Sequence, residues 1–307
     1  MSIAAVEDIS HLGFVVTDLD EAARFVTAFG MEIAEQTGER FYARGTGTAP
    51  FLYFAELGET PGFAALGIRV TSVDDLQRLA EHDGQPVVAY DGPGGGYVVR
   101  LTTPDGFVVE AVSGQEMRKP DQLEVFQVNQ GGQYPRVSRL RHTDPGPSRV
   151  MRLGHAVFAT ADLRKTEAWF KARFAMLTSD EIRLPDGNAM GVFLRWDRGD
   201  VPVDHHALFL MQKSPAAFHH GAFEVHDIDD IMRGQEHLRA AGYRHHFGVG
   251  RHHLGGQVFD YWFDPFGFQL EHWTDGDCLV RDDGSNVVGL ADLSRLGWGE
   301  PAISGAR

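Results

Sequence analysis

Two histidines and one glutamate lie in apolar, strand-like stretches of the second half of the chain, where ionisable side chains are uncommon. They are His155 in LGHAVFA, His220 in FHHGAFEV and Glu271 in GFQLEHW. A buried carboxylate needs a cation or another polar partner, and side chains alternate across a strand, so the three groups can face one interior. Two imidazoles and one carboxylate form the facial triad typical of non-haem Fe(II) and Mn(II) sites, whereas zinc sites more often add a third histidine or a cysteine. We therefore expect a metal site made of His155, His220 and Glu271.

Further polar groups lie in neighbouring stretches of the same half. His205 and His206 precede the apolar run ALFL, His252 and His253 follow GR, and Tyr261 lies in the alternating run QVFDYWF. A single histidine at a strand end is more often a surface residue or a satisfied core residue than a catalyst. The clustering beside a triad favours a functional role for one member of each pair.

The composition limits the classes of partner. The chain has 307 residues, 43% of them apolar, and a formal net charge of −15, which favours two domains and argues against nucleic acid or an anionic membrane as a partner. The single cysteine, Cys278, permits no intrachain disulfide, and the sequence shows neither a signal-peptide pattern nor an apolar run long enough to cross a membrane. We expect a cytoplasmic protein that binds a small molecule.

The chain contains an internal duplication. Three segments of the first half match three segments of the second half in the same order, and each half runs strand, helix, strands twice. This pattern predicts an α+β fold of two domains, each built from paired βαβββ modules. The matched pairs are 11–26 with 153–170, 63–76 with 218–231, and 103–112 with 264–273.

Composition also suggests where the domains end. The segment 115–149 is polar and rich in proline and glycine, as connectors often are. We place an N-terminal domain without a complete metal site at 1–135, a connector at 136–150 and a C-terminal metal-binding domain at 151–277. The remaining tail, 278–307, is expected to cover either the pocket or a subunit contact.

The duplication allows one half of the chain to be compared with the other. The second half has the complete His–His–Glu set, whereas the first half keeps the two outer members and has alanine in the middle. The alternative interpretation is that these are ordinary sheet residues without a metal. One complete His–His–Glu set on three apolar strands favours a single metal site. The aligned pairs are His155 with His11, His220 with Ala65, and Glu271 with Glu110.

Six segments together resemble a known enzyme family. They are GHAV (154–157), HHALFL (205–210), FHHGAFEV (218–225), GRH (250–252), FDYW (259–262) and DPFGFQLEHW (264–273). The combination resembles a type I extradiol ring-cleaving dioxygenase of the vicinal oxygen chelate superfamily, over roughly residues 5 to 275. In that family each half is a pair of βαβββ modules and only the C-terminal half keeps the metal.

The resemblance implies a role for each matching residue. His155, His220 and Glu271 would bind Fe(II), with Mn(II) as the alternative, while Val157 and Phe193 would form pocket walls.

Three further residues would act on oxygen and substrate. His206 would stabilise bound oxygen and act as acid and base, and His252 and Tyr261 would hydrogen-bond the substrate or the oxygenated intermediate. Some relatives have polar residues after GRH, where this chain has 254–256, Leu-Gly-Gly.

The expected activity is extradiol cleavage of a catechol-type aromatic by O2, in the degradation of aromatic compounds, by a homo-oligomer. The sequence does not distinguish single-ring catechols from bicyclic or polyhydroxylated ones. Two alternatives are a glyoxalase-like metal-dependent isomerase and a metal-free ligand-binding module of the same fold.

Overall fold

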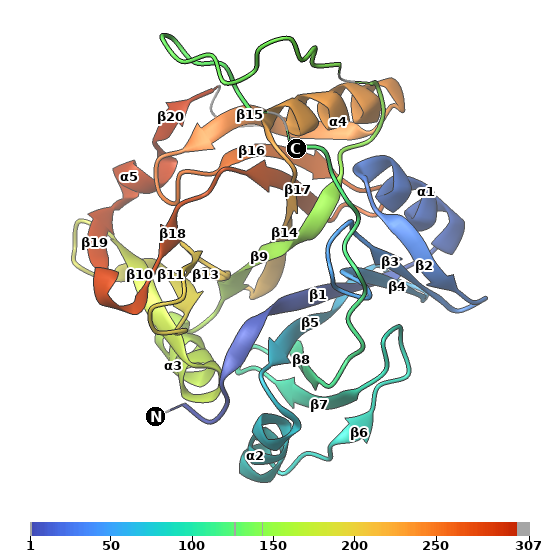
Figure 1. The fold of residues 1–307 in the computed structure, drawn as a ribbon. Coiled ribbons are helices and arrows are strands. Elements are labelled where there is room, and N and C mark those ends of the chain that lie inside the picture. The colour runs from blue at the N-terminus through green and yellow to red at the C-terminus, as the bar shows by residue number, and fades with distance from the viewer. Residues whose placement is uncertain (1, 126, 143, 300–307) are drawn as a thin grey trace.

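Four βαβββ modules follow one another in the computed structural model, which describes residues 2–125, 127–142 and 144–299. The α+β fold of paired βαβββ modules is confirmed (Figure 1). The first half contains β1 (Val6–Val16), α1 (Leu19–Phe29), β2 (Glu32–Gln36), β3 (Arg40–Arg44), β4 (Tyr53–Leu57), β5 (Gly62–Val70), α2 (Val73–Asp83), β6 (Val88–Ala89), β7 (Tyr97–Thr102) and β8 (Val108–Ser113). The second half contains β9 (Val150–Thr160), α3 (Leu163–Phe174), β10 (Met176–Arg183), β11 (Ala189–Trp196), β12 (Val203–Asp204), β13 (Leu208–Gln212), β14 (Ala217–Val225), α4 (Ile228–Ala240), β15 (Arg244–His252), β16 (Val258–Phe263) and β17 (Gln269–Thr274). The tail contains β18 (Cys278–Leu279), a 3-10 turn (Arg281–Asp283), β19 (Asn286–Gly289), α5 (Leu290–Ser294) and β20 (Leu296–Trp298).

Each half of the chain forms one large sheet. The first has the order β2-β3-β4-β1-β5-β8-β7-β6, and the second has the order β19-β10-β11-β13-β9-β14-β17-β16-β15-β20. Two modules join in each sheet through their first strands, which pair antiparallel as β1 with β5 and β9 with β14. The last strand of each module lies parallel to the first strand, as in β9 with β13 and β14 with β17. The central strands therefore bring three sequence-distant segments side by side.

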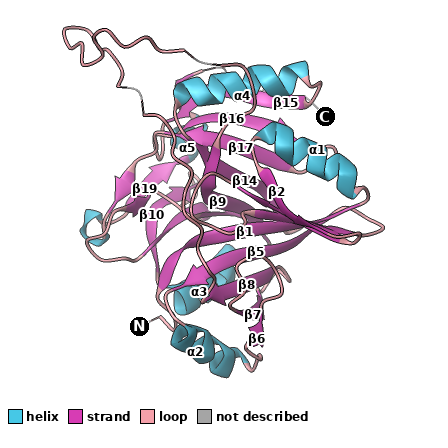
Figure 2. Cartoon of the chain, turned by 45° about the vertical axis from the view of Figure 1, so that its right-hand side comes forward, coloured by secondary structure: helices cyan, strands magenta, loops and turns pink. Residues whose placement is uncertain are grey.

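The helices begin at polar caps that follow directly after the first strand of each module. Asp18, Ser72, Asp162 and Asp227 each accept a hydrogen bond from a backbone N–H in the first turn of the following helix. The first helix ends at Gly30, whose φ of 109° favours glycine. The helices lie on the outside of the strands, and α1 and α4 lie beside each other (Figure 2).

Aromatic side chains join the two halves of the molecule. Phe63 from β5 stacks on Phe218 from β14 with ring centroids 4.7 Å apart, and it packs edge-on against Phe158 at 5.3 Å. Phe14 meets Phe218 at 5.4 Å. Aromatic pairs of this kind contribute about 0.5–1.5 kcal/mol each beyond their buried area, so this cluster fixes one sheet against the other.

The C-terminal tail adds a strand to each end of the second sheet. β19 pairs with β10, where Asp180 lies opposite Asn286, and β20 pairs with β15, where His252 lies opposite Leu296. α5 connects the two new edges, so the tail crosses from one end of the curved sheet to the other (Figure 1). Of the predicted tail, residues 300–307 lie outside the described residues.

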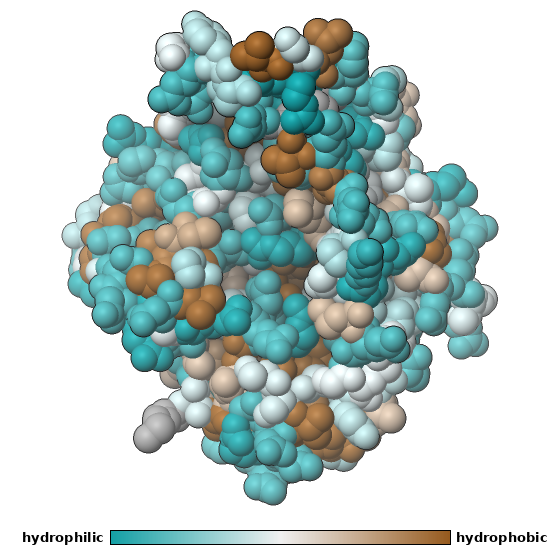
Figure 3. Space-filling model, in the orientation of Figure 1, coloured by the Kyte–Doolittle hydropathy of each residue, from teal (hydrophilic) through white to brown (hydrophobic). Residues whose placement is uncertain are grey.

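The long connection between the sheets is open chain on the surface. Between β8 and β9 the described residues contain only an isolated bridge, Gln130 with Gln133. Several apolar side chains of this segment are exposed, and Figure 3 shows apolar atoms at the top of an otherwise mostly hydrophilic face. No helix in the described part of the chain is long and apolar enough to cross a membrane.

Candidate metal centre

The three predicted metal ligands meet on adjacent strands of the second sheet. His155 on β9 lies opposite Ala222 on β14, and Ala222 lies opposite Glu271 on β17. The Nε2 atoms of His155 and His220 lie 3.2 and 3.3 Å from Oε2 of Glu271. Their potential ligand atoms all lie within 4.8 Å of one another, the single such group in residues 2–125, 127–142 and 144–299.

A β-bulge in β14 places the middle residue of the triad. Phe218 pairs with Phe158, but the next pair is His220 with Val157, so the register shifts by one residue between them. Strict alternation would place Phe218 and His220 on the same face of the strand, but the bulge separates them. Because of the bulge, Phe218 packs between the sheets while both His219 and His220 line the cavity beside the triad.

Glu271 is a buried anion without a positive partner. Its side chain is 0% exposed, and neither carboxylate oxygen has a well-aligned hydrogen-bond donor among the described residues. Burial by itself raises the pKa of Glu271, and the pKa falls below its usual range only through hydrogen bonds and positive charge from the imidazoles of His155 and His220. Burial also lowers the pKa of His220, which leaves its ring neutral and able to bind a cation. An ionised carboxylate beside neutral imidazoles is the donor set that suits a divalent cation.

The equivalent carboxylate in the first half, Glu110, has protein partners on both of its oxygens. His11 Nε2 lies 3.0 Å from Glu110 Oε2, and Nε of Arg100 donates to Oε1 at 2.8 Å. Arg100 lies opposite Glu110 across the β7–β8 pair, as Tyr261 lies opposite Glu271 across the β16–β17 pair. In the first half a guanidinium therefore supplies the positive charge that the second half lacks.

A cavity of about 140 Å³ opens beside the triad. Val157 and Phe193, the predicted pocket walls, both line it. Further lining residues were not predicted from the sequence, and one of them, Leu293, belongs to the tail. These additional lining residues are Phe209, Met211, His219, Leu254, Gln257 and Leu293.

All three predicted catalytic residues also line this cavity. The His206 ring lies next to that of His155, with centroids 4.3 Å apart. His252 Nε2 and the Tyr261 hydroxyl are 3.0 Å apart, which is hydrogen-bonding distance. Burial, and then the charge of Glu271, raises the pKa of Tyr261 well above its usual value, so the phenol stays protonated. Burial lowers the pKa of His206 well below its usual value, so the imidazole is neutral.

Two buried residues behind His206 were not predicted from the sequence. His205 Nδ1 lies 3.1 Å from His206 Nδ1, and His205 Nε2 lies 2.8 Å from Asp180 Oδ2. The dipeptide His205-His206 was recognised, but only its second member was given a role. Asp180 belongs to a different strand, so no short-range spacing connects it to the pair.

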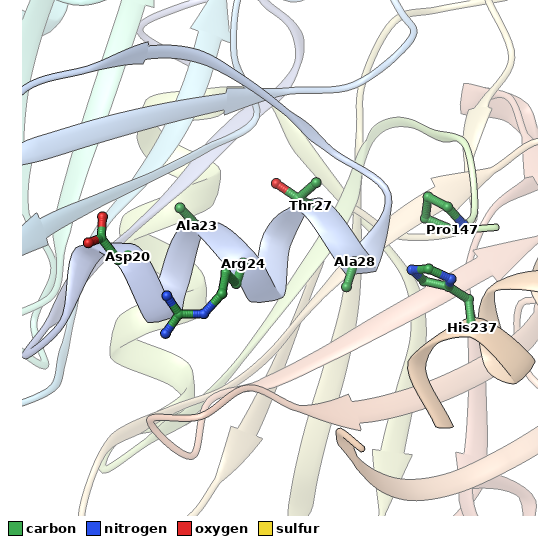
Figure 4. Close-up of a pocket in the computed structure, with 7 residues that line it drawn as sticks. All are labelled: Asp20, Ala23, Arg24, Thr27, Ala28, Pro147 and His237. Carbon is green, nitrogen blue, oxygen red and sulfur yellow. The ribbon is translucent and has the colours of Figure 1, made fainter. Parts of the chain in front are cut away.

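A larger hollow elsewhere on the molecule does not carry comparable chemistry. It measures about 650 Å³ and lies on the outside between α1 and α4, open to solvent (Figure 4). Asp20 and Arg24 on α1 and His237 on α4 are its ionisable lining residues. They are not part of the one triad-like group found in the described residues, so the smaller buried cavity is the better candidate site.

Known proteins share this organisation. A model of the Glyoxalase/Bleomycin resistance protein/Dioxygenase superfamily matches residues 8–111 and 152–272, one match in each half. Metapyrocatechase 2 of Cupriavidus necator is 28% identical over 281 residues, covering 90% of this chain and 83% of the relative. Manganese-dependent 2,3-dihydroxybiphenyl 1,2-dioxygenase of Geobacillus genomosp. 3 is 23% identical over 298 residues, covering 91% of this chain and 89% of the relative.

The fold itself matches a solved structure over almost its whole length. Homoprotocatechuate 2,3-dioxygenase of Brevibacterium fuscum, in complex with 3,4-dihydroxyphenylacetate, superposes with a TM-score of 0.82 at 18% identity, covering 99% of this chain and 92% of that chain. The two family-model matches coincide with the two duplicated halves of the chain. The chain belongs to the Glyoxalase/Bleomycin resistance protein/Dioxygenase superfamily.

Proposed function

We propose that this chain cleaves the ring of a catechol-type aromatic beside its two hydroxyl groups, using O2 and a divalent metal, in the degradation of aromatic compounds. The observation that carries the proposal is the uncompensated Glu271 carboxylate, which lies against the imidazoles of His155 and His220. These two rings line a cavity together with His206 and Tyr261. The likeness to metapyrocatechase 2 supports the same reaction class.

His155, His220 and Glu271 would hold the metal, and we propose Fe(II), with Mn(II) as the alternative. A bound ion of this kind acts as a Lewis acid that favours the anionic diol and allows electrons to pass from the ring to O2. Both ions suit the same ligand set, and one relative is named as manganese-dependent.

The protein groups around the cavity would orient the substrate and manage its protons. The protonated Tyr261 hydroxyl is a hydrogen-bond donor, and His252 beside it can accept from or donate to a substrate oxygen. The neutral His206 can take a proton from a diol hydroxyl and return it to the oxygen that leaves as the O–O bond breaks. Both atoms of O2 enter the product, one carbon–carbon bond beside the diol breaks, and no further reactant is required.

The cavity supports a small, uncharged substrate. Its volume of about 140 Å³ is below the roughly 300–1,000 Å³ of pockets for drug-sized ligands, which favours one ring over two. No lysine or arginine of the described chain lines it. A ring carboxylate would lie there without a cation, which costs about 3–5 kcal/mol for a buried charge.

Oxygen uptake on a panel of diols tests the proposal. Protein reconstituted with Fe(II) or Mn(II) without oxygen is mixed with catechol, methylcatechols, 2,3-dihydroxybiphenyl, trihydroxybenzenes and 3,4-dihydroxyphenylacetate. We expect one O2 per ring-opened chromophore, with kcat/KM for methylcatechol at least about 100-fold above that for 3,4-dihydroxyphenylacetate at pH 8, as the unpaired charge requires. No uptake with any diol, although the metal is retained, would overturn the proposal.

We also propose that the protein is a cytoplasmic homo-oligomer. The chain between β8 and β9 has exposed apolar side chains, and the three most exposed of them, Leu140, Val125 and Val137, are 78%, 71% and 71% accessible. Such side chains support a contact with a second copy of the chain. The single cysteine, Cys278, is exposed and unpaired, which suits a reducing compartment. Light scattering of wild type and of a variant with Lys at these three positions tests the oligomer; an unchanged mass would exclude this contact.

A further inference from the structure

A line of three buried side chains leads away from the cavity through His206. The line runs from Asp180 Oδ2 to His205 Nε2 at 2.8 Å, and from His205 Nδ1 to His206 Nδ1 at 3.1 Å. The three residues are 3%, 6% and 4% exposed in that order. His206 lines the cavity, whereas Asp180 and His205 do not. The two inner residues can therefore reach a substrate only through His206.

Neighbouring groups hold the inner end of this line in place. Nδ2 of Asn286, on the tail strand β19, donates to Asp180 Oδ1 at 3.1 Å. The Ser179 hydroxyl donates to the backbone carbonyl of His205 at 2.6 Å. Asp180 therefore has one oxygen occupied by Asn286 and the other directed at His205.

The hydrogen bonds determine where the protons lie. An ionised carboxylate only accepts, so His205 must carry its proton on Nε2, facing Asp180. The other nitrogen of a neutral His205, Nδ1, is then an acceptor, and His206 must donate to it from its own Nδ1. The proton of His206 is thus on the buried side of the ring, and Nε2 presents a lone pair on the opposite side.

We propose that Asp180 and His205 are positioning residues, which fix the ring orientation and the tautomer of His206 so that its Nε2 can accept a proton from the substrate. This inference rests on the proposed function, because it assumes that His206 acts on a diol. When a substrate hydroxyl transfers its proton to Nε2, the O–H bond breaks, an N–H bond forms and the positive charge lies on His206. The buried Nδ1–H then donates to His205, whose other nitrogen remains bonded to Asp180, and the same proton can later return to an oxygen of the product. The arrangement follows the logic of a buried carboxylate that orients a catalytic histidine.

Asp180→Asn reverses the donor and acceptor roles along the line of hydrogen bonds, while the side chain at position 180 keeps almost the same shape. Asn286 donates to the first oxygen position, so the new carboxamide keeps its oxygen there and presents NH2 to His205. His205 must then accept at Nε2 and carry its proton on Nδ1, which forces the proton of His206 onto Nε2. In this variant Nε2 of His206 presents an N–H donor to the cavity, whereas in the wild type it presents a lone pair.

Nitrogen NMR of the imidazoles tests the inference without any turnover. Protein containing 15N-histidine is loaded with diamagnetic Zn(II), and the His206 signals are identified by their loss in His206→Phe. We expect His206 to be protonated on Nδ1 in the wild type and on Nε2 in Asp180→Asn. The same tautomer in both proteins, or an Nε2-protonated ring in the wild type, would overturn the proposal whether or not the enzyme cleaves catechols.

Kinetics of the Fe(II) or Mn(II) protein provide a second readout. Because acid–base assistance contributes at least about 100-fold, Asp180→Asn should lower kcat by about that factor while KM and metal content change less than twofold. The matched control is Glu181→Gln, the next residue on the same strand, which pairs with Arg164 and Arg183 on the surface. It should change neither the tautomer nor kcat, and an equal loss in this control would contradict the proposal.

A second pair of variants covers the case in which Asp180→Asn does not fold. Gln at position 205 can donate to Asp180 through its NH2 and accept from His206 through its oxygen, whereas Leu can do neither. We expect His205→Gln to keep the wild-type tautomer and most of kcat, and His205→Leu to lose both. Equal activity in the two variants would show that His205 only fills space.

Discussion

Replacing Glu271 with glutamine should have opposite effects on the metal-free and the metal-loaded protein. The carboxylate is 0% exposed and has no cation among the described residues, and an unpaired buried ion costs several kcal/mol. At pH 8, where His220 is neutral because burial lowers its pKa, the variant removes this cost. We expect the metal-free variant to be about 2 kcal/mol more stable than wild type, which raises Tm by about 4 °C.

When metal is added, the wild type should become more stable than the Glu271→Gln variant. An ion at 100 times its Kd stabilises the wild type by about 2.7 kcal/mol, and the variant has lost the anionic ligand. Thermal unfolding in EDTA and in excess Mn(II), followed by circular dichroism, measures both differences.

Glu110→Gln is the matched control from the first half. Glu110 already has His11 and Arg100 as partners. Its loss should destabilise the protein by about 1–2 kcal/mol with or without metal, a modest value because the Arg100 side chain is 50% exposed. If Glu271→Gln destabilised the metal-free protein as much as Glu110→Gln does, the carboxylate would not be uncompensated and the reasoning would fail.

Three further predictions follow from named contacts. His220→Ala should abolish metal retention, measured by elemental analysis after gel filtration, whereas His11→Ala should leave it intact because His11 pairs with Glu110 rather than with the triad; loss of metal from the second variant alone would refute a single site. His206→Phe should keep metal and substrate binding but lower kcat by about 100-fold or more, since it removes the acid–base group; stopped-flow and steady-state assays separate the two effects. Burial raises the pKa of Asp264 to about 7. The protonated carboxyl therefore contributes its full stabilisation below pH 4, and this contribution is lost as the pH rises through 7. Asp264→Asn keeps an acceptor but cannot ionise, so its stability relative to wild type in urea unfolding should increase from pH 5 to pH 8, and a constant difference would contradict this pKa.

The architecture could be predicted because the sequence repeats it. Matching strands, helices with polar N-caps and turns recur in order, and the pairing registers agree with the predicted alignment. Leu12 pairs with Leu66 in the first sheet as Ala156 pairs with Gly221 in the second. Period-two alternation allowed His155, His220 and Glu271 to face one interior, whereas the other predicted site residues came from the family resemblance.

What the sequence could not predict depends on local irregularities and on distant contacts. The bulge before His220 adds one residue to β14, which no alternation rule anticipates, and it turns His219 toward the cavity as well. Asp180 reaches His205 across two strands of a folded sheet. Leu293 lines the cavity only because the tail crosses between the two edges of the sheet.

The registers also allow the two halves to be compared around the whole cavity. Tyr53 pairs with Leu12 as Leu208 pairs with Ala156, which places Phe51 at the position of His206. The backbone N–H of Tyr90 donates to Gly96 as that of His252 donates to Gln257, which matches Tyr90 with His252. The first half therefore carries, in order, His11, Ala65, Glu110, Phe51, Tyr90 and Arg100 where the second carries His155, His220, Glu271, His206, His252 and Tyr261.

These differences in sequence explain why the first half is stable without a ligand, whereas the second half is not complete without one. In the first half the Phe51 ring lies 4.6 Å from that of His11 and stacks on Tyr90 at 5.7 Å, so aromatic carbon occupies the space beside the triad position. Arg100 neutralises the carboxylate of Glu110. The second half instead keeps an open cavity and an unpaired buried anion, both of which reduce the stability of the protein alone. The first half shows that the same fold can fill these positions with a more stable arrangement. The less stable arrangement in the second half is therefore best explained by a cation and a substrate that complete it.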